Sequence, residues 1–267
     1  MDRQDLASNL VAYCGPESEW PAAYWGPERL DPVAWRELTP LIDAREEIGA
    51  LVAAMRGVGS IADVGGGTGL LTREVAARVA PVVVIEPSAA QRAGLPAPDD
   101  DARITSVAGR AERVPLADGA VDAAMATWVL QYTDDPAAAV RELARIARTR
   151  VVIVQAAPPP RNDLVAVYTV EAAVAGLPRA HHGWLLARAA ATLEAAGWTV
   201  ELRAVASTVA APDGGAAELA DVLARLHFAG HERIAEMRAA TKPMILERLR
   251  TNVGVLRDDA VMLVGRR

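Results

Sequence analysis

The apolar residues of this 267-residue chain follow two kinds of repeat that alternate along most of its length. Short continuous runs such as Val82–Ile85 are apolar on both faces, which is typical of strands buried in a parallel sheet. Stretches such as 70–79 carry apolar residues at helical spacing instead. The seven expected strands are 60–64, 82–85, 103–107, 123–127, 151–154, 198–206 and 258–264. This alternation predicts an α/β fold with a mostly parallel sheet and helices on both faces.

Two helical segments are expected outside this core. Residues 1–57 are divided by prolines into short helices rich in Trp and Tyr, and we interpret them as a helical N-terminal lid or a small satellite core. Residues 207–257 show two helical stretches between the last two strands and predict an insertion that serves as a substrate cap or a dimer contact. The core then comprises residues 58–206, and residues 258–267 supply the last strand of its sheet.

The turn after the first expected strand carries the glycines, in the sequence Asp63-Val-Gly-Gly-Gly-Thr-Gly69. A strand, a glycine turn and a helix together direct backbone N–H groups at a polar ligand, and Thr68 is placed to cap the helix. Glycine tolerates positive φ and has no Cβ to keep a ligand away. Glu86 follows about 20 residues later at the tip of the second strand, where a carboxylate accepts from both hydroxyls of a ribose. The pattern predicts a ligand that contains a nucleoside.

The glycine spacing distinguishes between nucleoside ligands. Gly65, Gly67 and Gly69, preceded by Asp63, resemble the first motif of class I S-adenosylmethionine-dependent methyltransferases. Leu70 stands where the dinucleotide fingerprint has its last glycine. A second stretch, GRAERVPLADGAVDAAMA, resembles the loop and strand of the type 11 methyltransferase domain family. The resemblance covers about residues 60–155 and implies a Rossmann-like seven-stranded sheet that binds S-adenosyl-L-methionine and releases S-adenosyl-L-homocysteine.

The same resemblance implies a set of cofactor contacts. Arg110 stands where the family often has aspartate, whereas backbone contacts from Ala111 and Glu112 to the adenine do not depend on that side chain. The expected cofactor-binding residues are Asp63, Gly65, Gly66, Gly67, Gly69, Glu86, Pro87, Arg110, Ala111, Glu112 and Thr127. Tyr24 is added from the interpretation of the N-terminal segment as a lid, outside the resemblance.

Acceptor contacts are expected at the carboxyl edge of the sheet and in the lids. The candidates are Trp25, Trp128, Gln131, Tyr132, Tyr168, Trp184, His227 and His231. If the acceptor must lose a proton, His181 and His182 are the expected general bases, because they occupy a polar break after the fifth strand; a structural histidine is the competing interpretation. The aromatic and apolar lids favour a small, fairly apolar acceptor, as in natural-product tailoring.

Composition narrows the partners. The net charge of −6 and the lack of a long basic run argue against nucleic acid. Cys14 is the single cysteine, so neither an internal disulfide nor a cysteine-based metal site is expected, and no other spacing indicates a metal. No apolar stretch approaches the roughly 18 residues of a membrane span, and the N-terminus does not resemble a signal peptide. We therefore expect a cytoplasmic protein that contacts neither membrane nor nucleic acid.

The expected function is methyl transfer from S-adenosylmethionine to an O, N or C nucleophile of a small molecule by in-line displacement. Two alternatives stay open at this point: an NAD-dependent oxidoreductase on a similar fold, and a non-catalytic S-adenosylmethionine-binding protein. The sequence leaves undecided the natural acceptor, the methylated atom, the need for a base, the role of residues 207–257 and whether the chain forms a homodimer.

Overall fold

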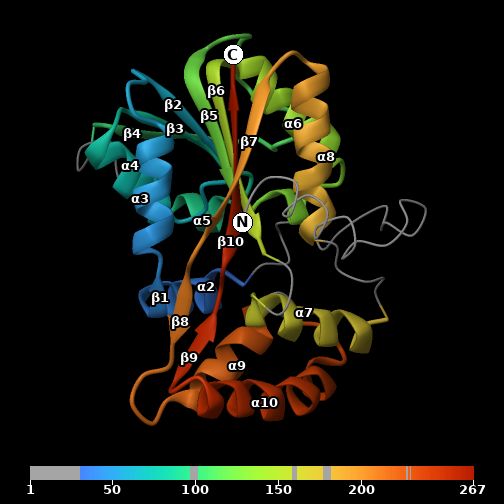
Figure 1. Ribbon diagram of the computed structural model, residues 1–267. Coiled ribbons are helices and arrows are strands. Elements are labelled where there is room, and N and C mark those ends of the chain that lie inside the picture. Colours follow the sequence, from blue (N-terminus) through green and yellow to red (C-terminus); the bar gives the residue numbers. More distant parts are fainter. Residues whose placement is uncertain (1–30, 97–101, 158–160, 177–181, 227, 229) are drawn as a thin grey trace.

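A sheet of seven strands forms the centre of the molecule (Figure 1). The computed structural model describes residues 31–96, 102–157, 161–176, 182–226, 228 and 230–267, with the backbone only at 182–184. The strands of the sheet are β2 (Ile61–Val64), β3 (Val82–Ile85), β4 (Ile104–Val107), β5 (Val121–Thr127), β6 (Ala147–Ala156), β7 (Thr199–Val205) and β10 (Ala260–Arg266).

The order of the strands across the sheet is β4-β3-β2-β5-β6-β10-β7. Every ladder from β4 to β6 is parallel, whereas β10 runs antiparallel to both β6 and β7. The chain moves outward from β2 through β3 to β4 and then returns to the other side of β2 at β5. This reversal makes the carboxyl ends of β2 and β5 the expected position for a ligand. The predicted α/β, Rossmann-like fold is confirmed.

Helices cover both faces of this sheet, as predicted. On one face, α3 (Arg45–Ala54) and α4 (Leu70–Arg78) bury residues such as Leu51 and Val75 against the strands. On the other face, α6 (Pro136–Ile146) and α8 (His182–Ala195) bury residues such as Leu143 and Leu186. The short helix α5 (Ala89–Arg92) follows β3. The apolar faces of these helices therefore complete the hydrophobic core on each side of the sheet.

A second group of elements lies across the carboxyl ends of the parallel strands, below the sheet in Figure 1. We call it the cap. It consists of the helices α2 (Pro32–Leu38), α7 (Asp163–Val174), α9 (Ala216–Leu226) and α10 (Ile234–Thr251) with the antiparallel strands β1 (Ile42–Asp43), β8 (Thr208–Ala210) and β9 (Val255–Arg257). Leu38, Leu223 and Ile245 belong to its own apolar core. Segments far apart in the sequence thus form one layer over the sheet edge.

The two helices expected in residues 207–257 are present as α9 and α10, between the strands β7 and β10 as predicted. The strands β1, β8 and β9 were not expected. Residues 1–30 lie outside the described residues, so the helical N-terminal lid stays a prediction. The described part of the expected lid is divided between the cap and the sheet. Helix α2 and strand β1 belong to the cap, whereas helix α3 packs on the sheet. Within the described residues, none of the helices combines the length and apolarity needed to cross a bilayer.

The start of α4 differs from the prediction that Thr68 caps it. Gly69 occupies the N-cap position in the left-handed conformation, with φ of +83°, and no side chain caps the helix. Glycine adopts this conformation at little cost, whereas threonine does not. Thr68 is buried instead, and its side chain lies beside Gly94.

Candidate functional site

The glycine turn forms one wall of a cleft between the sheet and the cap. The Gly65 N–H donates to the carbonyl of Ile85 at 2.6 Å, which joins the ends of β2 and β3. A Cβ on Gly65 would lie 2.5 Å from the Val129 side chain, so no larger residue fits there. Gly67 is different, because its φ is +58° and a Cβ would meet nothing within 4 Å. Gly67 therefore leaves an open approach to the main chain on the cleft side.

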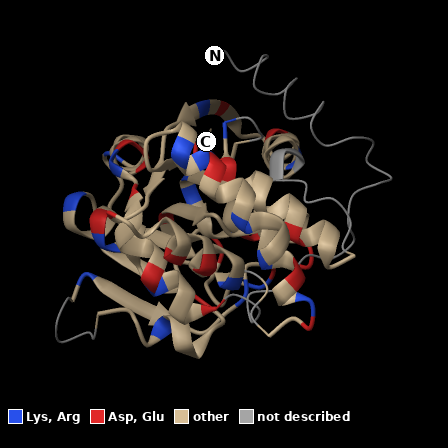
Figure 2. Ribbon diagram, turned by 90° about the horizontal axis from the view of Figure 1, so that it is seen from below, with Lys and Arg blue, Asp and Glu red and all other residues tan. Residues whose placement is uncertain are grey.

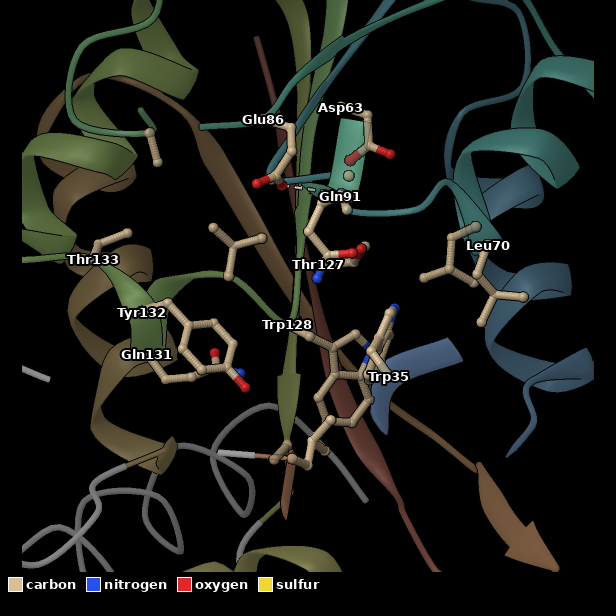
Figure 3. Close-up of a pocket in the computed structure, with 18 of the residues that line it drawn as sticks. Trp35, Asp63, Leu70, Glu86, Gln91, Thr127, Trp128, Gln131, Tyr132 and Thr133 are labelled. Carbon is tan, nitrogen blue, oxygen red and sulfur yellow. Dashed lines mark hydrogen bonds between the residues drawn. The ribbon is translucent and has the colours of Figure 1, made fainter. Parts of the chain in front are cut away.

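Glu86 is held by the backbone at the end of β3. Its Oε2 accepts from the Gly67 N–H at 3.1 Å, and its Oε1 accepts from the Ser88 N–H at 2.9 Å. Burial raises the pKa of Glu86, and these two hydrogen bonds oppose that shift. The carboxylate is thus fixed in the cleft wall beside the glycine turn (Figure 3).

Asp63 lies beneath the glycine turn with one oxygen unsatisfied. The Thr72 hydroxyl donates to its Oδ2 at 2.5 Å. Its Oδ1 is buried without a hydrogen-bond partner among the described residues. Burial raises the pKa of Asp63 to about 7, and the neighbouring charge of Glu86 adds to the shift. A buried acceptor that lacks a donor is costly unless a ligand or water supplies one.

The loop after β4 closes the next side of the cleft. Arg110 forms an ion pair of 2.9 Å with Asp134 and lies 3.5 Å from Glu112. Glu112 in turn accepts from the Asp134 N–H at 2.7 Å. The Arg110 guanidinium is therefore engaged with carboxylates at the rim, while Ala111 lines the cleft beside it.

Trp128 directly follows β5 and has an unusual backbone conformation. Its φ is +62°, a region that a residue with a bulky side chain occupies only under constraint. The Trp128 N–H donates to the carbonyl of Val154 at 2.8 Å. The indole Nε1 donates to Oε1 of Glu47 on α3 at 2.9 Å. Burial raises the pKa of Glu47 to about 7, and the bond from Trp128 opposes the shift.

The opposite end of the cleft lies under the cap. Asn162 and Asp258 meet there, because the Asn162 Nδ2 donates to Oδ1 of Asp258 at 3.0 Å. Burial raises the pKa of Asp258 well above its usual value, and the charges of Glu47 and Asp259 add to the shift. Figure 3 shows Trp35, Trp128 and Tyr132 at this end, away from Glu86. The cleft therefore has a polar end at the glycine turn and an aromatic end that contains buried acids.

Most of the predicted site residues in the described part of the chain line this one cleft. They are Asp63, Gly65, Gly66, Gly67, Glu86, Pro87, Arg110, Ala111, Glu112, Thr127, Trp128, Gln131, Tyr132 and Tyr168. Gly69 lies outside the lining and acts at the start of α4. His231 is also outside it: its ring packs edge-on against Phe228, and its Nδ1 accepts from the Arg233 N–H.

Other predicted site residues lie outside the described structure. They are Tyr24, Trp25, His181 and His227, together with the side chains of His182 and Trp184. Their roles in cofactor binding, acceptor binding and base catalysis stay predictions.

Several residues of the cleft were not among the predicted site residues, and Trp35, Glu47, Asn162 and Asp258 are polar or aromatic examples. Glu47 had a signal, since it lies four residues before Leu51 on the buried stripe of α3. A carboxylate on an apolar stripe indicates a specific partner. Asn162 and Asp258 are 96 residues apart, and no pattern in the sequence indicates that they meet.

Charges on the surface away from the cleft are mixed. Figure 2 shows the molecule from the cap side, with basic and acidic residues interspersed. Arg233 at the N-cap of α10 pairs with Glu236, and Arg250 near its end pairs with Glu247, three positions apart in each case. In the described part of the chain, no group of three or more His, Cys, Asp or Glu side chains could hold a metal ion.

Comparison with known proteins identifies a family that includes the glycine turn and Glu86. Residues 62–154 match the family model of a methyltransferase domain, which spans the glycine turn, Glu86 and the strands β3 to β6. No curated protein sequence matches the chain.

Solved structures share the fold over most of the chain. A candidate methyltransferase from an antibiotic biosynthesis pathway of Anabaena variabilis is 18% identical over 85% of this chain and 98% of its own, with a TM-score of 0.61. The YcgJ protein of Bacillus subtilis is 15% identical over 84% and 98%, with a TM-score of 0.58. The [4+2]-cyclase SpnF is 21% identical over 84% and 81%, with a TM-score of 0.52. The domain match identifies a methyltransferase domain at residues 62–154, and the solved structures share the fold of the chain around it.

Proposed function

We propose that this protein transfers the methyl group of S-adenosylmethionine to a small, fairly apolar acceptor bound between the sheet and the cap. The observation that carries the proposal is the wall formed by Gly67 and Glu86. There an open main-chain surface and a carboxylate fixed by backbone amides stand side by side at the switch point of the sheet.

The residues present fit the cofactor at three points. The Glu86 carboxylate is an acceptor suited to the two ribose hydroxyls. The open side of Gly67 admits close approach to the main chain. The unpartnered Oδ1 of Asp63 lies beneath this turn as an acceptor suited to an ammonium or a water that the cofactor binds. By resemblance to the family, Ala111 would border the adenine and Thr127 the methionine part.

S-adenosylmethionine, when bound, supplies an electrophilic methyl group on a sulfonium. The protein must then hold the acceptor in line with that methyl group and exclude water. The apolar side chains under the cap are suited to both requirements, because Leu38, Leu164 and Leu226 line the cleft together with the aromatic residues Trp35 and Tyr168. This lining supports an apolar small molecule as acceptor, and natural-product tailoring is the setting we propose for it.

Leu70 argues against the oxidoreductase alternative. Its side chain lines the cleft where a dinucleotide site has a glycine for close packing. The non-catalytic alternative differs from our proposal only in turnover, so a binding measurement does not separate the two.

The experiment is a pair of assays on the full chain. In the first, S-adenosylhomocysteine and NAD are titrated separately; we expect binding of the former and none of the latter, and the reverse contradicts the proposal. In the second, S-adenosylmethionine with a labelled methyl group is incubated with panels of arylalkyl amines, phenols and carboxylic acids. We expect a methylated product and an equal amount of S-adenosylhomocysteine. A chain that binds S-adenosylhomocysteine but methylates no panel member supports the non-catalytic alternative.

A further inference from the structure

The aromatic end of the cleft contains buried hydrogen-bond acceptors that the proposed cofactor contacts do not use. Three of them come from separate elements: Glu47 on α3, Gln131 after β5, and Asp258 between β9 and β10. All three side chains line the cleft, and all are more than nine-tenths buried. Burial of acceptors without hydrogen-bond donors costs free energy. The three acceptors in one cleft therefore indicate a ligand that supplies hydrogen-bond donors.

Glu47 is the most constrained of the three. Its carboxylate is 2% exposed, and the indole N–H of Trp128 donates to Oε1. The positive φ of Trp128 turns the indole toward α3 at a cost in backbone strain. A single neutral donor does not compensate a buried carboxylate, which has about four lone-pair sites.

Gln131 supplies a second acceptor. Its amide hydrogen-bonds the Tyr132 hydroxyl. Its Oε1 is buried without a partner among the described residues. Figure 3 shows Gln131 and Tyr132 together on the side of the cleft opposite Leu70. The bond to Tyr132 orients the amide, and its oxygen is left without a donor.

Asp258 links the other two groups. The Asn162 amide donates to its Oδ1, and its charge acts on both Glu47 and the Tyr132 hydroxyl. Among the described residues that line the cleft, the cationic side chain is Arg110. It forms an ion pair with Asp134 at the rim, beside the proposed adenine position. The aromatic end therefore has two acids and an amide oxygen, and the lining cation lies at the other end.

We propose that this end of the cleft binds the protonated amine of the acceptor, and that Glu47 takes a proton from it before methyl transfer. The inference rests on the proposed function and narrows its acceptor class. An ammonium offers three N–H donors and a positive charge, which match the two carboxylates and the Gln131 oxygen. The faces of Trp35 and Trp128 suit the same cation. A carboxylate or phosphate acceptor would be repelled by Glu47 and Asp258.

The step balances without a further reactant. One N–H bond of the ammonium breaks, and its proton moves to the Glu47 carboxylate, which becomes a neutral acid. The nitrogen lone pair then forms a bond to the methyl carbon while the carbon–sulfur bond breaks. The electron pair of that bond stays on sulfur, which leaves the neutral thioether S-adenosylhomocysteine and a methylated ammonium.

The experiment compares amines with alcohols of the same shape. Tryptamine is titrated against 3-(2-hydroxyethyl)indole, and 2-phenylethylamine against 2-phenylethanol, each by calorimetry at neutral pH with and without S-adenosylhomocysteine. We expect each amine to bind at least about 10-fold more tightly than its alcohol, as hydrogen bonds to a charged group imply. We expect Glu47→Gln to reduce this preference to within about threefold, because the amide keeps the acceptor but loses the charge.

Glu46→Gln is the matched control. It makes the same chemical change one residue away, on an exposed side chain that accepts from the Ala206 N–H, and we expect it to keep the preference for amines. Asp258→Asn serves as a second test if Glu47→Gln does not fold. Equal affinity for amine and alcohol in the parent, no binding of either amine, or a preference that survives both substitutions overturns the inference. If the parent does not bind S-adenosylhomocysteine, the proposed function is contradicted instead. The amine titrations made without S-adenosylhomocysteine then still test the inference.

Discussion

The indole Nε1 of Trp128 lies 2.9 Å from Oε1 of Glu47 and joins the end of β5 to helix α3, across 81 positions of the chain. Trp128 adopts a φ of +62° at this position, and Glu47 is almost completely buried. The bond therefore connects a strained backbone to a buried acid on the wall of the cleft. Both features are costly to stability, and such features concentrate at functional sites.

Trp128→Phe removes the indole N–H and leaves the Glu47 carboxylate without this hydrogen-bond donor. We expect the free energy of unfolding to fall by about 1–3 kcal/mol at pH 8, where Glu47 is ionised, and by less at pH 5, where it is protonated. Urea denaturation at the two pH values measures both differences. Trp198→Phe is the control, because the Trp198 Nε1 is buried without a partner among the described residues. A Trp128→Phe deficit that does not change with pH would contradict this account of the bond.

Glu47→Gln tests the raised pKa of Glu47 itself. The pKa of this carboxyl is about 7 in the folded protein, against an ordinary value of 4.5 that we take for the unfolded chain. Between these values the folded state keeps a proton that the unfolded state loses, so the charge destabilises the fold increasingly as the pH rises. We expect Glu47→Gln to gain stability relative to the parent from pH 4.5 to pH 7, by on the order of 2–3 kcal/mol, and to change little above this window.

The measurement is the free energy of unfolding of parent and variant across pH 4.5–8. Glu46→Gln provides the control, because it makes the same chemical change at the exposed neighbouring position. The charge of Glu47 also raises the pKa of Asp258, so Glu47→Gln relieves part of the Asp258 shift as well, which adds to the gain in stability in the same direction. A relative stability of Glu47→Gln that falls as the pH rises would show that Glu47 is stabilised in its charged form, contrary to our interpretation.

Arg110→Ala tests the loop beside the proposed adenine position. The Arg110 side chain is 41% exposed, and its ion pair with Asp134 lies at the surface. We expect the affinity for S-adenosylhomocysteine to change by less than about fivefold, equivalent to about 1 kcal/mol, since the implied adenine contacts come from the backbone. Calorimetric titration of parent and variant measures this. A much larger loss would mean that the guanidinium itself contacts the cofactor.

The parts of the fold that the sequence predicted depend on local patterns. The glycine turn and Glu86 could be recognised because their spacing along the chain determines their relation in space: β2 and β3 are adjacent parallel strands in register. Continuous apolar runs identified the buried strands for the same reason. The helices α9 and α10 were predictable from their apolar spacing, although their packing against α2 and α7 was not.

The parts that were missed depend on contacts between distant segments. β1 has two residues and pairs with β8 more than 160 positions later, so it shows no repeat that a sequence can reveal. Asp258 reaches the cleft only because β9 and β10 pass the start of α7, where Asn162 binds it. The left-handed Gly69 at the start of α4 could have been anticipated, since glycine adopts that conformation more readily than Thr68.

The most direct measurement of the central claim is the calorimetric affinity for S-adenosylhomocysteine of the parent, Gly67→Val and Glu86→Ala. We expect Gly67→Val to weaken binding by about 100-fold or more, because a side chain at φ of +58° strains the turn and fills the open side of the cleft. We expect Glu86→Ala to weaken it by about 10- to 100-fold through loss of a charged acceptor. Gly176→Val, at an exposed glycine with φ of +72°, and Glu74→Ala are the controls and should bind as the parent does. Folded Gly67→Val and Glu86→Ala proteins that bind S-adenosylhomocysteine as tightly as the parent would contradict the account.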